Sequence, residues 1–249
     1  MKIRLIIIVF LSNAFAFVGC NSEETTNTVV DTNENSSLNV DSTGFDWSVA
    51  PLKVNIVTEG LVSEMEFADL DSVKTHVYNY FHLQQTGNSA DYVKHFDYYP
   101  SMFDNNEAQK TAFLEATIKW WNMGYRNIFE SVDINYASDW IYEEDQKVAL
   151  IGFDLKFRTE FSEKYPYDPK VLIETLQRQM PQAEIEFIDE EPIRSIVAYD
   201  TQGLFIYTPL DEFDFAFLNQ REGSNNNMDS LMLRDTRLNL LREKREALK

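Results

Sequence analysis

The sequence predicts an α+β fold in which helices lie on one face of an antiparallel sheet. Between about residues 69 and 124, apolar side chains recur at three- and four-residue steps, which is the period of an amphipathic helix. From about residue 128 they recur at every second position, as in strands with one buried face. Helices followed by a run of strands favour a layer of helices packed against one antiparallel sheet.

The expected helices of the first part span residues 69–85, 90–99 and 107–124. Gly87 closes the first helix and Pro100 stops the second, because proline cannot continue a helix. The third ends at Gly124, a residue type that suits a helix C-terminus. It carries two apolar stripes and is therefore expected to be sandwiched between other elements. The pair Trp120 and Trp121 is accordingly interpreted as core and rim rather than as a ligand cage.

The second part is expected to consist mainly of strands. Alternating patterns or turn signals place them at 128–136, 149–157, 183–188, 192–200, 203–208 and 213–217. A turn at Thr201-Gln202-Gly203 is expected between two of them. A helix opened by Asp168-Pro169 and closed by Pro181 interrupts the series, and a charged helix within 228–249 ends the chain.

This arrangement resembles the NTF2-like, cystatin-like α+β cone. The likeness is carried by the helix at 69–85, the YYPSMF stretch at 98–103, the third helix and the strands up to about Phe161. After Phe161 the chain departs from that pattern, because the helix near 169–180 interrupts the strands. The resemblance implies a curved sheet with an apolar pocket between sheet and helices.

Enzymes of this family resemble one another in using an acid or base in that pocket, whose pKa is tuned by burial. The resemblance implies weak catalytic candidates at His76 and Tyr80 on the first helix and at His95 and Asp97 on the second. On a helical wheel Tyr80 flanks the apolar stripe, and Asp97 lies at the edge of the second helix's apolar face, with His95 outside it. A histidine or tyrosine at a helix flank is more often a boundary residue than a catalyst.

The N-terminus resembles a bacterial lipoprotein signal. Lys2 and Arg4 precede an apolar run that ends at Gly19-Cys20 and is too short to span a bilayer. The segment from Phe17 to Cys20 resembles the lipobox, although Phe17 stands where leucine is usual. The resemblance implies diacylation of Cys20, which is the chain's single cysteine, and multiple acyl chains supply stable anchoring.

A polar segment rich in Asn, Ser, Thr and Glu follows Cys20, and such a composition favours a disordered tether. With about 25 residues its root-mean-square reach is about 25 to 30 Å. The chain is thus divided into a leader at 1–19, a tether at 20–45, an α+β domain at 46–222 and a charged helical end at 223–249. The acidic residues after Asn21 resemble surface-export signals of Bacteroidetes lipoproteins, which implies an outer-membrane location with a periplasmic or cell-surface face.

Charge excludes some partners. The formal charge is −19, from 22 basic and 41 acidic residues, so the chain lacks the basic footprint that nucleic-acid binding requires. No histidine pair has a zinc-ligand spacing, and the cluster Glu143-Glu144-Asp145 lacks the calcium-loop pattern. Neither a phosphate-binding loop nor a dinucleotide fingerprint is present. No metal or cofactor is therefore expected.

Three functions remain open at the level of sequence. The first, which we favour, is a non-catalytic binding module for a small apolar ligand or an envelope protein. The second is a cavity enzyme of the isomerase, cyclase or dehydratase kind, which requires an ionisable side chain in the pocket. The third is a structural or assembly lipoprotein whose terminal helix docks on an outer-membrane complex.

Overall fold

In the computed structural model, the described residues are 45–48, 52–57, 59, 61–63, 65–98, 107–210, 215–219 and 232–248. The expected leader, Cys20 and nearly all of the expected tether lie outside them. Within these ranges, no helix combines the length and the apolar character that crossing a bilayer demands.

The described strands form one eight-stranded sheet whose main path runs β1-β3-β5-β7-β6. These strands are β1 (Lys53–Ile56), β3 (Tyr125–Ala137), β5 (Gln146–Phe161), β7 (Arg194–Pro209) and β6 (Glu184–Ile188). The short strands β2 (Val62–Ser63), β4 (Ile141–Tyr142) and β8 (Ala216–Asn219) pair with β3, β5 and β7. β1 and β2 run parallel to β3, and the remaining pairs are antiparallel. The predicted α+β class is confirmed.

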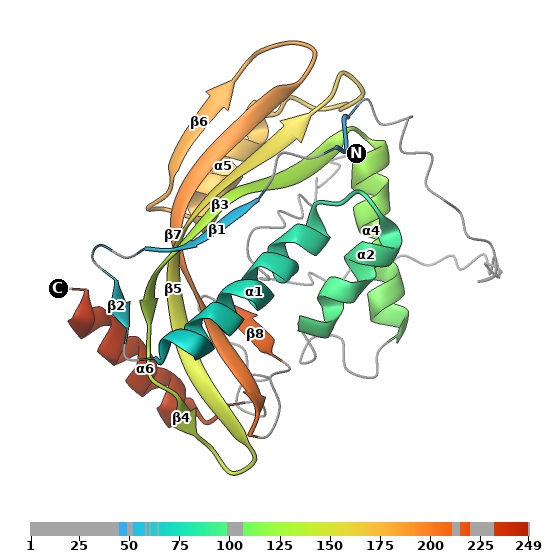
Figure 1. Ribbon diagram of the computed structural model, residues 1–249. Coiled ribbons are helices and arrows are strands. Elements are labelled where there is room, and N and C mark those ends of the chain that lie inside the picture. Colours follow the sequence, from blue (N-terminus) through green and yellow to red (C-terminus); the bar gives the residue numbers. More distant parts are fainter. Residues whose placement is uncertain are drawn as a thin grey trace.

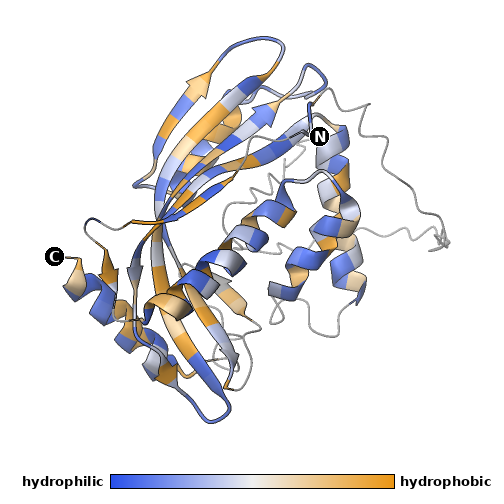
Figure 2. Ribbon diagram, in the orientation of Figure 1, coloured by the Kyte–Doolittle hydropathy of each residue, from blue (hydrophilic) through white to orange (hydrophobic). Residues whose placement is uncertain are grey.

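Most of the described helices cover the same face of this sheet (Figure 1). They are α1 (Phe67–Gln84), α2 (Ser89–Lys94), the 3₁₀ turn η2 (His95–Tyr98), α4 (Glu107–Asn122) and α5 (Lys170–Gln179). Phe153, Phe157 and Phe161 of β5 are fully buried beneath this layer. Every second residue of β5 thus enters one core, and the banding of apolar and polar residues along the upper strands is visible in Figure 2.

The terminal helix α6 (Arg234–Ala247) packs on the opposite face. Its Leu240 is fully buried against Val148 and Leu150 of β5 and Phe205 of β7. The expected helix at 228–249 is therefore present over a shorter range, and it is docked on the domain. Burial of this apolar side supplies the stability that an isolated short helix lacks.

The turn predicted at Thr201-Gln202-Gly203 is wrong, because β7 passes through it as one continuous strand. Thr201 pairs with Asp154 and Gly203 pairs with Gly152 of β5. The facing glycines offer no side chain beside a bulge of the neighbouring strand β3, between Ile134 and Tyr136, and glycine within a strand often marks a bulge or a sharp bend. The glycine therefore marks curvature and not a hairpin.

The expectation that the third helix is sandwiched is also wrong for the described residues. In α4 only Thr117 and Trp121 are buried, and Ala112 is exposed. The two apolar stripes are adjacent and together cover one face. Trp121 lies in the core and Trp120 packs partly buried at its margin, as predicted.

The other differences are one shifted strand and three short strands. β8 begins at Ala216, so the expected strand at 213–217 is shifted toward the C-terminus, and its first two residues lie outside the described ranges. The strands β1, β2 and β4 were not predicted, because four residues or fewer give too little alternation to recognise.

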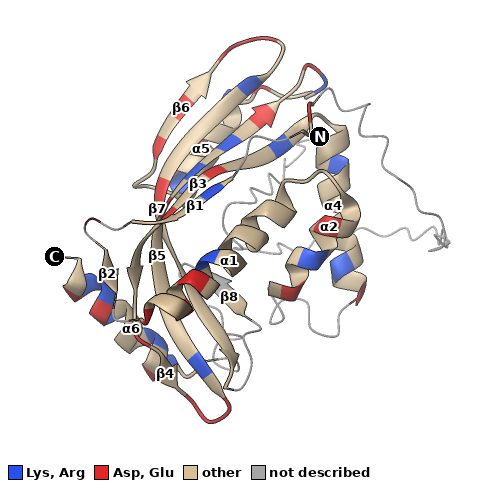
Figure 3. Cartoon of the chain, in the orientation of Figure 1, with Lys and Arg blue, Asp and Glu red and all other residues tan. Residues whose placement is uncertain are grey.

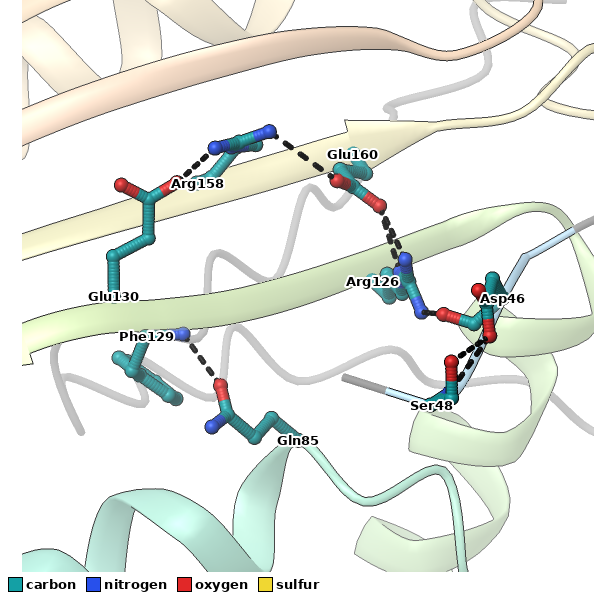
Figure 4. Close-up of polar contacts among 8 residues, drawn as sticks. All are labelled: Asp46, Ser48, Gln85, Arg126, Phe129, Glu130, Arg158 and Glu160. Carbon is teal, nitrogen blue, oxygen red and sulfur yellow. Dashed lines mark hydrogen bonds and ion pairs between the residues drawn. The ribbon is translucent and has the colours of Figure 1, made fainter. Parts of the chain in front are cut away.

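The described chain begins with a segment fastened to the sheet by Arg126 (Figure 4). The Arg126 guanidinium donates to the carbonyl oxygen of Asp46 at 2.6 Å and to the carboxylate of Glu160 at 2.8 Å. It also lies over the rings of Phe45 and Trp47, at 4.6 and 5.0 Å from their centroids. Phe45 is buried, so it packs with the domain although it was assigned to the tether.

Candidate functional site

The structure brings three of the weak catalytic candidates, His76, Tyr80 and His95, into one aromatic cluster beside α1. Tyr98 joins them: its hydroxyl is 3.5 Å from Nδ1 of His76, and its ring centroid is 5.9 Å from that of Tyr80. The rings of Tyr80 and His95 are 6.3 Å apart. Phe217 stacks on Tyr98 at 5.1 Å, so this end of the helical layer is filled with aromatic rings.

The placement of His95 and Asp97 on a helical wheel is wrong. His95 is buried at 4% exposure, whereas Asp97 is exposed. The α-helix ends at Lys94 and the chain continues as the 3₁₀ turn η2. Because a 3₁₀ turn has three residues per turn instead of 3.6, the side chains after Lys94 point in other directions. Asp97 is thus separated from the other candidates.

His95 is held as a neutral ring. Burial lowers its pKa to about 4, although the hydrogen bond to the Tyr92 carbonyl oxygen acts in the opposite direction. That bond joins Nδ1 to the carbonyl at 2.6 Å. Because a carbonyl only accepts, Nδ1 carries the proton of the neutral ring. The histidine therefore contributes packing and one local hydrogen bond.

Between α4, α1 and the sheet lies a cavity of about 20 Å³. That volume holds about one water molecule. The wall consists of Gln84, Tyr92, Thr117, Trp120, Trp121, Tyr125, Asn127 and Phe129. Burial raises the pKa of both the Tyr92 and the Tyr125 hydroxyls, so both stay neutral. This cavity contains no charged acid or base.

A larger depression of about 380 Å³ lies on the opposite, open face of the sheet. We call it the outer groove. It is lined by Ser131, Asp133, Asp154, Leu155, Lys156, Gln182, Glu184, Tyr199, Asp200 and Thr201. Charged positions gather on the neighbouring strands β1, β3, β5 and β7 (Figure 3). The groove is therefore polar, and acidic residues outnumber basic ones in its wall.

Hydrogen bonds hold the acidic side chains of the outer groove in place. Asp154 accepts from Thr201 Oγ1 at 2.7 Å and from Asn135 Nδ2 at 3.0 Å. Asp133 accepts from Asn55 Nδ2 at 2.7 Å. These hydrogen bonds fix the positions of the two carboxylates.

Lys156 is bound to a neighbouring carboxylate. Its Nζ lies 2.7 Å from Glu130, and the hydrogen bonds that it donates to Glu130 and Tyr199 raise its pKa. Burial alone would raise the pKa of Glu130, but its bonds to Lys156 and Arg158 outweigh burial and lower it. The ammonium of Lys156 is therefore paired with the carboxylate of Glu130.

Helix α6 ends beside the outer groove. Lys244 inserts over Gly152, where a Cβ would lie 2.8 Å from Lys244 Cε. Asp154, the next residue of β5 on the same face, lines the groove. Desolvation lowers the pKa of Lys244 to about 8, and the charge of Asp154 opposes that shift. The docked helix therefore closes off the face next to the groove.

The sequence contained a signal for the outer groove that the pattern of apolar residues obscured. Asp154 and Lys156 alternate with Phe153, Leu155 and Phe157 in a strand whose earlier part is apolar on both faces. A change from apolar to charged residues on one face indicates where that face becomes open. The other groove residues come from β3, β6, β7 and the turn before β6, and only the pairing of the strands brings them together.

Comparison with known proteins gives no relative for this chain. No protein-family model matches it, and neither the curated proteins nor the solved structures yielded a match. Across the residues that the structure describes, no three His, Cys, Asp or Glu side chains are grouped as metal ligands would be. The case for function therefore depends on the geometry of the outer groove and of the interior.

Proposed function

We propose that this chain is a lipid-anchored envelope lipoprotein whose folded domain is a non-catalytic binding module for a partner protein. The observation that carries the proposal is the outer groove, an open polar depression of about 380 Å³ on the face of the sheet. Small-molecule sites are typically enclosed and mostly apolar. An open groove with ordered carboxylates fits the polar surface of another protein better.

The interior supports a partner protein over a small apolar ligand. The cavity between α4 and the sheet, at about 20 Å³, is far below the roughly 300 Å³ of a typical ligand pocket. The interior also favours a binding module over a cavity enzyme. The two cavity tyrosines, Tyr92 and Tyr125, stay neutral, and His95, outside the cavity wall, has a pKa of about 4. A general base works best with a pKa near the ambient pH.

We also propose that the domain is a divergent NTF2-like cone. The support is the position of α1 and α4 on one face of a bent sheet whose central strands are β3, β5 and β7. The parallel strand β1, the helix α5 and the helix α6 on the outer face are departures from the cone. In this interpretation the pocket of the cone is filled by aromatic side chains.

The proposed membrane anchor involves acylation of Cys20. Mass spectrometry of the mature protein tests it: the expected N-terminal residue is Cys20 carrying acyl chains, and Cys20→Ser is expected to retain the leader and lose the lipid. A wild-type protein recovered without acyl chains contradicts the anchor.

Photocrosslinking in the intact envelope tests the groove. A photoreactive residue replaces Tyr199, which is in the groove and 44% exposed. The matched control replaces Tyr167, which is 40% exposed and outside the groove lining. A discrete protein adduct is expected from position 199 and not from position 167, and the double change Asp133→Asn with Asp154→Asn is expected to reduce it.

Equal adducts at both positions, or an adduct at position 199 that is indifferent to the two Asn substitutions, contradict a role for the groove. Circular dichroism and thermal unfolding of each variant separate a loss of binding from a loss of fold.

A further inference from the structure

The strand β6 lies at the edge of the sheet. It pairs with β7 from Glu184↔Tyr199 to Ile188↔Ser195, and no other described strand pairs with it. In Figure 1 it forms the upper margin of the sheet, with α5 behind it. An edge strand carries a row of backbone N–H and C=O groups that a further strand can pair with.

The side chains of β6 alternate in character. Glu184 and Glu186 are exposed, whereas Ile185 and Phe187 are half-buried and pack against the main core. A strand added next to β6 would meet acidic side chains on the outer face and apolar side chains on the inner face, because directly opposed residues share a face. The edge therefore favours a partner strand whose side chains also alternate between two kinds, one for each face of the sheet.

We infer that β6 binds an extended segment of a partner protein in which basic residues alternate with apolar ones. Backbone pairing supplies affinity in this mode, and alternate side chains supply specificity. The inference rests on the proposed binding function and names the partner's chemistry. Glu184 belongs both to β6 and to the outer groove, so basic residues of the added strand lie close to the groove's carboxylates.

Two copies of this chain are poorly suited to pair through the same edge. Continuing the sheet with a second β6 would bring the outer-face glutamates of the two strands together, and like charges facing across strands are destabilising. The formal charge of −19 adds long-range repulsion. Lys170 lies 5.2 Å from the ring of Phe187 and 3.7 Å from Asp189, so its charge is already engaged beside the strand.

The test uses the full-length lipoprotein in detergent and three short labelled peptides, with binding measured by fluorescence anisotropy. One alternates Lys with Val, the second alternates Glu with Val, and the third is the Lys–Val peptide with N-methyl groups on the amides that would pair. Binding is expected for the first peptide only. The double variant E184K/E186K is expected to weaken it about tenfold and to gain affinity for the Glu–Val peptide.

The matched control is E243K/E246K, which makes the same change of net charge at exposed positions of α6. It is expected to bind the Lys–Val peptide nearly as well as the wild type. Hydrogen–deuterium exchange is expected to show slower exchange of the β6 amides in the complex. Equal loss of binding in both double variants would show that binding depends on net charge and not on the β6 glutamates, and would overturn the inference.

Binding of the Lys–Val peptide without protection of β6 overturns strand addition but leaves a binding role for the groove intact. A concentration-dependent dimer that protects β6 in the absence of peptide identifies a second copy as the occupant and also overturns the inference. If photocrosslinking at position 199 fails while the β6 amides are protected, the binding role of the groove is contradicted and strand addition at β6 stands.

Discussion

The ammonium of Lys244 donates to the carbonyl oxygen of Gln202 at 3.2 Å, and so joins the terminal helix to the bend of the sheet. Gln202 immediately precedes Gly203, which pairs with Gly152 beneath the lysine. The lysine is only 8% exposed. A cation in this position is costly to bury, and its contact with the bend makes α6 sensitive to both pH and side-chain volume.

Replacement of Lys244 by Met is expected to change how stability depends on pH. The pKa is about 8 in the folded protein and 10.5 in the unfolded chain. Between these values the unfolded chain binds more protons, so the unfolding free energy of the wild type rises with pH relative to Lys244→Met, by up to ~3 kcal/mol. Urea denaturation of both proteins at pH 7 to 10.5 measures it, and parallel pH curves would contradict the buried charge.

A side chain at Gly152 is expected to dislodge Lys244. The added Cβ of Gly152→Ala would lie 2.8 Å from Lys244 Cε and 3.1 Å from Tyr136 Cβ, so a loss of about 1 to 3 kcal/mol is expected. In a Lys244→Ala background the same substitution should cost less, because the flexible side chain is gone. A double-mutant cycle measures the difference, and strictly additive effects would show that the contact with Tyr136 dominates.

Breaking the buried pair of Arg126 and Glu160 is expected to be strongly destabilising. Both side chains are largely buried and lie 2.6 Å apart, so Arg126→Met leaves a carboxylate without its closest partner, at a cost of about 3 to 5 kcal/mol. The double substitution with Glu160→Gln should recover part of this loss. Breaking the exposed pair of Lys94 and Asp91 with Lys94→Met serves as the control and should cost at most about 1 kcal/mol.

Acid is expected to destabilise the domain through His95. Its pKa is about 4 in the folded protein against an ordinary 6.5, so stability is fully present above pH 6.5 and falls as pH decreases toward 4, by up to ~3 kcal/mol. The variant His95→Phe should lack this component, whereas His82→Gln, at the half-exposed end of α1, should retain it. Thermal unfolding across this range decides, and an unchanged slope in His95→Phe would count against a buried neutral ring.

The fold class and most long elements were predictable because their apolar periods are local. Leu70, Val73, Val77 and Phe81 are all buried in α1, as the stripe predicts. Gly124 follows α4 with φ of +79°, the conformation expected of a glycine after a helix. Such signals depend only on neighbours in sequence.

The errors came from features that depend on distant partners. Gly203 looks like a turn residue until its pairing with Gly152 is known, and His95 changes face because the helix tightens after Lys94. The outer groove combines residues from four strands, so no single segment of sequence contains it. Asp154 and Lys156 are the part of that site that forms a pattern within one segment of the sequence.

The fastening at Arg126 determines where mechanical load would enter the molecule. If the chain is held by lipid at Cys20, tension on the segment after Cys20 reaches the described part of the domain at residues 45–48. The first bonds to carry it are those from the Arg126 guanidinium to Asp46, together with the contact of the Trp47 ring on Trp121. Arg126 stands near the start of β3, where β5 is the described strand that pairs with it, because β1 joins β3 only from Ser131 onward. A pull on residues 45–48 is therefore delivered to the pairing of β3 with β5, at a place where no described strand flanks β3 on its other side.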